Sequence, residues 1–284
     1  MKLRVVHRTS YCYREPATTS HHEARLTPRQ SEGQRTVTFD LEITPAPASR
    51  RSRLDYFGNR VTYFGMTEPH HRLDVVATSL VEMAPVPLPE FSDTEPWEEV
   101  ARLLREDHRR DVLQATQMRL DSPLVPRGGE LAEYARPCFA PGRPTLEGVH
   151  ELMSRIHHDF SYDAAATEVG TPVLSVLRDR RGVCQDFAHV MIGCLRSLGL
   201  AARYVSGYLR TRPPEGRPRL VGADASHAWL SVWLPALGWV DFDPTNDLCP
   251  GQEHVTLAVR RDFGDVTPLR GVILGGSAQS LEVS

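Results

Sequence analysis

The sequence lacks the features by which membrane and exported proteins are usually identified. Among its 284 residues, no apolar run approaches the roughly 20 residues that a membrane-spanning helix needs. The N-terminus, MKLRVVHRTSYCYREP, has neither the apolar core nor the small-residue cleavage site of a signal peptide. We therefore expect a cytoplasmic protein that has no membrane partner.

A large excess of positive charge is also missing. The formal net charge is -3, and Lys2 is the only lysine among the 33 basic residues. Nucleic acids and anionic membranes select strongly basic surfaces. The charge therefore gives no reason to expect a nucleic-acid partner. Hydrophobic residues make up 40% and charged residues 24%, which is the balance of a soluble globular protein.

Cysteines are few and widely spaced. The five of them form no CxxC pair of the kind that binds zinc, and a chain of this length does not depend on disulfides. We expect free thiols that are either buried or reactive. Adjacent histidines at 21–22, 70–71 and 157–158 point apart on a strand or a helix, so we expect hydrogen-bonding or surface histidines there instead of a metal site.

The first 83 residues have the patterns of β-strands. Residues 37–45 alternate apolar and polar side chains, which is typical of a half-buried strand, and residues 55–66 carry a Gly-Asn turn between aromatic segments. Residues 73–83 predict a further strand. The segment 84–96 is rich in proline, which removes ladder donors, so we interpret it as a linker.

The rest of the chain alternates helical and strand-like segments. Residues 98–107 and 145–160 have the spacing of amphipathic helices. Residues 171–179 predict a short helix with Thr171 as its N-cap and Pro172 as its first residue. Strand-like segments then follow to about residue 247. The fold class predicted is α+β.

A cysteine stands at the start of the most strongly patterned helix. Residues 184–198 predict a helix that ends at Gly199 and is roughly 22 Å long. Cys184 lies in its first turn, where free N–H groups and the positive end of the helix dipole stabilise a thiolate or an oxyanion. The alternative is a buried cysteine that fills space, and that interpretation suits Cys194, which we assign to the core.

A histidine and an aspartate lie on a predicted hairpin farther along the chain. Residues 227–234 and 238–243 alternate as two strands joined by a short loop. Antiparallel pairing brings His227 opposite a residue near 243–246. Asp243 can then orient the imidazole, and the imidazole can take the proton from Cys184, as in covalent acyl transfer. A purely structural histidine is the alternative.

Three motifs in this order resemble the transglutaminase-like superfamily: RRGVCQDFAH at 180–189, SHAWL at 226–230 and GWVDFDPT at 238–245. The resemblance implies that Cys184 is the nucleophile, His227 the base and Asp243 the orienting carboxylate. Asp241 is excluded, because the family's aspartate directly precedes the Pro-Thr pair.

The resemblance extends to both ends of the chain. Residues 7–29 and 55–59 are similar to the N-terminal region of bacterial transglutaminase-like proteins, and residues 258–272 are similar to the tail after their core. In that tail, Arg260 stands where the family pattern has glycine. The resemblance implies a β-rich domain at 1–83, a linker at 84–96 and a core at 97–284. In that papain-like core, the nucleophile helix packs on an antiparallel sheet.

The activity that the resemblance implies is acyl transfer through a thioester. Members of the family include peptidases, amidases and protein cross-linkers, and they differ in whether water or an amine resolves the thioester. We expect a peptide or protein amide as substrate. The sequence has no acidic calcium loop, so we expect no metal and no cofactor. A non-catalytic module that keeps the fold and binds a peptide is the alternative.

Overall fold

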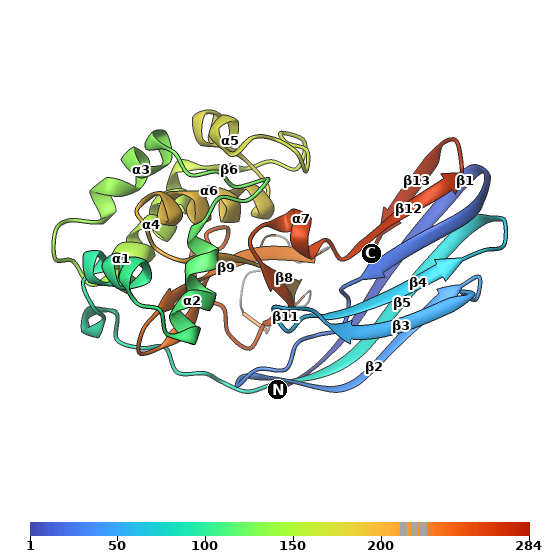
Figure 1. Ribbon diagram of the computed structural model, residues 1–284, viewed down its shortest axis with the longest axis horizontal. Coiled ribbons are helices and arrows are strands. Elements are labelled where there is room, and N and C mark those ends of the chain that lie inside the picture. Colours follow the sequence, from blue (N-terminus) through green and yellow to red (C-terminus); the bar gives the residue numbers. More distant parts are fainter. Residues whose placement is uncertain (211–214, 217–220, 222–225) are drawn as a thin grey trace.

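The computed structural model describes residues 1–210, 215–216, 221 and 226–284. A layer of long strands forms one side of the molecule, and helices packed on a shorter sheet form the other (Figure 1). This arrangement confirms the predicted α+β fold class. Within the described ranges, no helix is both long and apolar enough to cross a bilayer.

The N-terminal sheet is built from both ends of the chain. Its strand order is β2-β5-β1-β4-β3, and the last two strands, β12 and β13, also pair with β1. The strands are β1 (Lys2–Ala24), β2 (Gln34–Thr44), β3 (Ser49–Leu54), β4 (Arg60–Met66), β5 (His70–Met83), β12 (Leu269–Gly275) and β13 (Gln279–Val283).

The C-terminal tail differs in position from the prediction, which groups it with the core. The reason lies in β1, because the register of its pairing with β5 shifts between Cys12 and Ala17. The first half of β1 pairs with β5 and β13, and the second half pairs with β4 and β12. The tail thus covers backbone N–H and C=O groups that an open strand edge would expose.

The core sheet has the order β10-β9-β8-β11 and is antiparallel throughout. Its strands are β8 (Ala202–Leu209), β9 (Ser226–Leu234), β10 (Gly238–Phe242) and β11 (His254–Arg260), and a separate two-residue pair joins β6 (Ser161–Tyr162) to β7 (Arg181–Gly182). The predicted hairpin at 227–243 is confirmed, because Trp239 pairs with Trp233 and Asp241 with Ser231.

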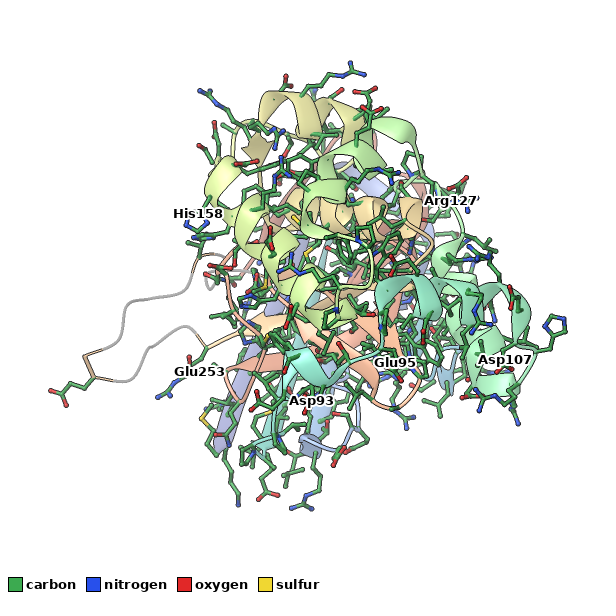
Figure 2. The ribbon with its side chains drawn as sticks, turned by 90° about the vertical axis from the view of Figure 1, so that its left-hand side faces the viewer. Asp93, Glu95, Asp107, Arg127, His158 and Glu253 are labelled. Atoms are coloured by element: carbon green, nitrogen blue, oxygen red, sulfur yellow. The ribbon has the colours of Figure 1, made fainter. Side chains whose placement is uncertain are left out.

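Helices surround α6 on the side away from the sheet (Figure 1). The α-helices are α1 (Trp97–Glu106), α2 (Arg110–Thr116), α3 (Gly129–Ala135), α4 (Thr145–Asp159), α5 (Val173–Asp179), α6 (Cys184–Ser197) and α7 (Phe263–Val266), and the 3-10 helices are η1 (Phe91–Asp93), η2 (Gln117–Arg119) and η3 (Arg136–Cys138). Exposed side chains such as Arg127 and His158 lie around the outside of this layer (Figure 2).

Helix α6 is buried more completely than its sequence pattern suggests. The predicted helix has one apolar face, but all its residues except Gln185 and Ser197 are buried, because α3, α4 and α5 cover the side that faces away from the sheet. Gly199 follows it with φ of +90°, as predicted for the C-terminal glycine. Even Arg196 is buried, and its guanidinium donates to the backbone oxygens of Met118, Ala202 and Arg261.

The start of α5 differs by one residue from the prediction. The N-cap is Pro172, and the helix begins at Val173. The Thr171 hydroxyl does not cap the helix, because it accepts a hydrogen bond from the Glu168 N–H upstream, at 2.9 Å.

The two halves of the molecule are joined along β11, the edge strand of the core sheet. The side chain of Asn59, in the turn between β3 and β4, donates to the Val259 oxygen at 3.0 Å and accepts from the Val259 N–H at 2.9 Å. Gln34 pairs with both backbone groups of Thr256 in the same way. Arg260, the departure from the family pattern, forms an ion pair with Asp55 at 2.9 Å.

We predict that Asn59→Ala destabilises the protein by about 2–3 kcal/mol, because it leaves two buried backbone groups of Val259 unpaired. The free energy of unfolding in urea measures this effect. Tyr56→Phe is the matched control in the same turn: it removes a hydrogen bond from a side chain that is 68% exposed, so we expect a change within about 0.5 kcal/mol. Equal effects of the two substitutions would contradict the prediction.

Candidate active site

Cys184 is the first residue of α6 and is 8% exposed. The side chain of Asp186 holds the turn before it, because Asp186 Oδ2 accepts a hydrogen bond from the Val183 N–H at 2.8 Å and another from the Thr167 hydroxyl. The turn requires glycine at position 182, since a Cβ there would lie 2.5 Å from Asp186 Oδ2. The Arg-Gly-Val-Cys segment therefore presents the thiol at the helix N-terminus.

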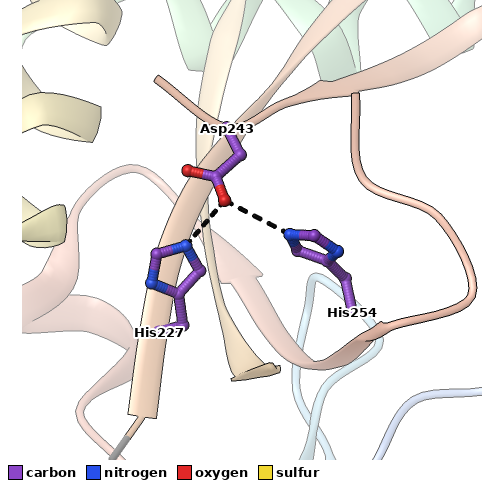
Figure 3. A group of neighbouring side chains, drawn as sticks. All are labelled: His227, Asp243 and His254. Carbon is purple, nitrogen blue, oxygen red and sulfur yellow. Dashed lines mark hydrogen bonds and ion pairs between the residues drawn. The ribbon is translucent and has the colours of Figure 1, made fainter. Parts of the chain in front are cut away.

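His227 lies at the start of β9, and Asp243 directly follows β10. Their side chains are buried, and His227 Nε2 lies 2.8 Å from Asp243 Oδ2 (Figure 3). The ring of Trp229, two residues along the same strand, stacks on the imidazole at 6.0 Å between centroids. The hairpin thus brings together the histidine and the aspartate that the sequence predicts to be neighbours.

Asp243 receives further hydrogen bonds from the turn after β10 and from β11. The Thr245 N–H donates to Oδ1 at 3.0 Å, and the Asn246 side-chain N–H donates to Oδ2 at 2.8 Å. His254 Nε2, at the start of β11, lies 3.2 Å from the same Oδ2 (Figure 3). The carboxylate is thus satisfied although no part of it reaches solvent.

The electrostatics of the pair favour its ionised form. Burial alone raises the pKa of Asp243, but the charges and hydrogen bonds of His227 and His254 outweigh it and lower that pKa. Burial alone lowers the pKa of His227, but the charge and hydrogen bond of Asp243, with a smaller effect of Cys184, raise it. The site therefore holds a carboxylate and an imidazolium together.

Cys184 lies close to the imidazole of His227. The thiol is close enough to raise the pKa of His227. Because Nε2 faces Asp243, Nδ1 is the ring nitrogen left for the thiol. Within the described residues this buried Nδ1 has no partner at hydrogen-bond geometry, so the thiol contact is looser than a normal hydrogen bond. The three residues that the sequence predicts are thus brought together.

Cys194 and Asp241, which the sequence excludes from the site, lie in surroundings that differ from those of the His227–Asp243 pair. Cys194 is fully buried in the core, and burial raises the pKa of its thiol well above the ordinary value. Asp241 accepts hydrogen bonds from the Trp229 indole N–H at 3.1 Å and from the Ser231 hydroxyl. The predicted histidine pairs are also used for hydrogen bonds: His157 Nδ1 lies 3.0 Å from the Thr245 oxygen, and its neighbour His158 is exposed.

Sequence reasoning missed His254 and Asn246. Asn246 directly follows the Asp-Pro-Thr motif, so its place beside the aspartate could have been found from the turn. His254 is a lone histidine with no motif around it, and only the pairing of β11 with β8 brings it to Asp243. No signal in the sequence marks that pairing.

His227, Asp243 and His254 are also close enough together for metal ligands: within the described part of the chain, one ligand atom of each lies within 4.8 Å of the others. However, Asp243 Oδ2 already accepts from His227, Asn246 and His254. A metal ion would have to displace these donors. We therefore interpret the cluster as a hydrogen-bond network.

A cavity of about 610 Å³ lies elsewhere, between the N-terminal half and the core sheet, and Arg29, Arg203 and Trp239 are among the residues that line it. Neither Cys184, His227 nor Asp243 lines this cavity. We place the candidate active site at Cys184, His227 and Asp243 and not at this cavity. The contacts among these three side chains indicate a particular chemistry, whereas the size of a cavity does not.

The fold and the cluster define the class of the protein, a papain-like cysteine enzyme family. A model of the bacterial transglutaminase-like N-terminal region matches residues 3–82, and a model of the transglutaminase-like superfamily matches residues 132–244. The chain therefore belongs to the transglutaminase-like superfamily.

Relatives and a solved structure agree with this assignment. An uncharacterized protein of Mycobacterium tuberculosis is 43% identical over 287 residues, which is 99% of this chain and 90% of that protein. A protein-glutamine gamma-glutamyltransferase of Pseudomonas aeruginosa is 32% identical over 129 residues, 44% of this chain and 19% of that protein. The crystal structure of a candidate cysteine protease from Cytophaga hutchinsonii has the same fold, with a TM-score of 0.73 and 20% identity over 100% of this chain and 92% of that chain.

We predict that the His227–Asp243 ion pair makes stability depend on pH. Because the fold raises the pKa of His227, the pair contributes fully below the unfolded value of about 6.5 and loses its contribution as pH rises toward the folded pKa. The difference in free energy of unfolding between wild type and His227→Gln should be larger at pH 6 than at pH 9, by at least about 1 kcal/mol.

Glutamine is the chosen replacement because it keeps an N–H for Asp243 and removes only the titrating charge. His108→Gln, at an exposed position, is the control and should leave the pH dependence unchanged. A wild-type minus His227→Gln difference that is flat with pH would mean that the pair is not ionised.

Proposed function

We propose that the protein is a thiol enzyme that transfers the acyl group of an amide through a thioester on Cys184. One observation carries the proposal: one ring nitrogen of the buried His227 faces a buried carboxylate, and the other is left for a thiol at a helix N-terminus. In this arrangement His227 is the general base and acid, and Asp243 orients it and stabilises its charge.

The mechanism follows from these positions. In the reactive state His227 Nδ1 already carries the proton of the Cys184 thiol, and the Cys184 thiolate attacks the amide carbonyl carbon, whose oxygen takes the negative charge. When the C–N bond breaks, the imidazolium gives that proton to the leaving nitrogen, and the acyl group remains on Cys184 as a thioester. An incoming water or amine then gives a proton back to Nδ1 as it attacks, and the thiolate leaves.

The start of α6 supplies what the developing oxyanion needs. The N–H groups of Cys184 and Gln185 precede the first intrahelical hydrogen bonds, and the positive end of the helix dipole points the same way. Fixed donors of this kind stabilise a tetrahedral intermediate strongly in a site that excludes water.

The substrate proposed is a peptide or protein amide, and the site needs no metal or cofactor for the steps above. The named relative from Pseudomonas aeruginosa is a glutamyltransferase and the solved structure is a candidate protease, and both reactions pass through the same thioester. We therefore propose a peptidase or amidase, or a transglutaminase. A non-catalytic peptide-binding module is the alternative, and it would need no reactive thiol.

We predict that Cys184 is the most reactive thiol of the protein. Iodoacetamide near pH 7 should alkylate it at least about tenfold faster than Cys12, although Cys12 is exposed and Cys184 is 8% exposed, because thiolates and not thiols react. Peptide mass spectrometry measures both rates in one sample. His227→Ala should slow Cys184 by at least about tenfold and leave Cys12 unchanged. If Cys184 reacts more slowly than Cys12 in the wild type, the binding-module alternative is favoured.

A second prediction concerns turnover. Amide-bearing peptides should be converted by the wild type and by Cys194→Ala, and not by Cys184→Ala, because only one of these two cysteines of α6 faces His227. Incubation with a peptide library, with and without a fluorescent primary amine, separates the two outcomes by product mass. Incorporated amine indicates transfer, and shortened or deamidated peptide indicates hydrolysis. Equal loss of product in both variants would contradict the assignment of Cys184.

A further inference from the structure

Two imidazole rings share one oxygen of Asp243. His227 Nε2 lies 2.8 Å and His254 Nε2 lies 3.2 Å from the same Oδ2, and the two rings approach it from different sides (Figure 3). The Cys184 thiol lies close enough to His227 to raise the pKa of its imidazole. His254 bonds the pair at the carboxylate, and its ring lies beside the His227 ring, with centroids 6.2 Å apart. It is therefore a second histidine of the site with a different position in it.

Among the described residues, the side chain of His254 hydrogen-bonds to this carboxylate alone. A carboxylate only accepts hydrogen bonds, so His254 Nε2 carries the proton. Its other ring nitrogen, Nδ1, is buried and without a hydrogen-bond partner in the described portion of the chain. A buried polar atom left unpaired is costly, and a histidine kept at that cost is explained by what its other nitrogen does.

The surroundings hold the His254 ring in place. The side chain is 4% exposed, and the ring of Trp229 meets it edge-on, with centroids 5.3 Å apart and planes at 85°. Its backbone is in register with Leu209 on β8, and its N–H donates to the Gly251 oxygen at 3.0 Å. The donor therefore comes from a rigid strand on the far side of the carboxylate from β9.

Three N–H donors then determine where Asp243 Oδ2 lies. Asn246 belongs to the turn that carries the aspartate, His254 comes from β11, and His227 is the residue to be oriented. The Thr245 N–H holds the other oxygen at 3.0 Å. A carboxylate held at both oxygens cannot rotate away from the imidazole, and the charge and hydrogen bond of His254 also lower the pKa of Asp243.

We propose that His254 is a positioning residue of the acyl-transfer reaction: it fixes the carboxylate that orients His227. The proposal rests on the proposed function, and it adds a fourth residue to the Cys184, His227 and Asp243 set. His254 acts only through Asp243 and His227, and it touches neither the thiol nor the substrate.

The test uses three replacements of His254 in the full chain. His254→Phe keeps a ring beside Trp229 but removes the donor. His254→Gln keeps an N–H at about the position of Nε2, and His254→Asn carries an amide too short to reach. We expect Phe and Asn to slow the alkylation of Cys184 by iodoacetamide about tenfold and Gln to restore most of the rate. Cys12, which is exposed, reports any change in the reagent in the same sample, and the buried Cys194 reports global unfolding.

A double-mutant cycle separates positioning from a structural role. If His254 acts through His227, then His254→Phe slows Cys184 in the wild type and has no further effect in His227→Ala. Slowing by the same factor in both backgrounds, or a Gln variant as slow as Phe, would overturn the proposal. His254→Asn takes the place of Phe in the cycle if the Phe variant does not fold.

The same measurements distinguish the two levels of inference. If His227→Ala leaves the rate of Cys184 unchanged, the proposed function itself fails. If His227→Ala slows Cys184 and His254→Phe does not, the triad stands and only the role of His254 is lost.

Discussion

The structure depends on keeping one carboxylate charged in a place that water does not reach. Asp243 is 0% exposed, and an isolated carboxylate there would take up a proton instead of remaining ionised. Donors from β9, from the turn after β10 and from β11 surround it. These pieces of chain meet because the start of β9, the end of β10 and the start of β11 lie at the same end of the core sheet. The same carboxylate then provides the charge that a general base needs beside it.

The N-terminal half supports this site although it contributes none of the residues at its centre. β11, which carries His254, is an edge strand of the core sheet, and an edge strand presents unpaired N–H and C=O groups. The side chains of Asn59 and Gln34 occupy those groups at Val259 and Thr256. The hydrogen bond from His254 to the carboxylate thus depends on a strand that the N-terminal half holds in place. The chain after β11 also returns to that half, where β12 and β13 pair with β1.

The sequence predicts the parts of the site that local pattern specifies. The helix after Gly182 and the hairpin of β9 and β10 follow from periodicity and a short loop. The resemblance of three motifs to the superfamily then singles out Cys184, His227 and Asp243 on these elements. His254 could not, because it reaches Asp243 through a pairing of β11 with β8 that no local signal records. The near-complete burial of α6 and the return of the tail to β1 have the same cause: both are set by segments distant in sequence.

In the proposed reaction, the choice between water and an amine as acceptor depends on what surrounds Cys184 and not on His227 and Asp243. Both acceptors give their proton to the same nitrogen, so the pair treats them alike. The segment between β6 and α5 is bound to the first turn of α6, through Thr167 to Asp186 and through the Gln185 side chain to the Val169 oxygen at 3.1 Å. These residues beside Cys184, and not the buried carboxylate with its donors, are therefore expected to determine which acceptor the proposed enzyme uses.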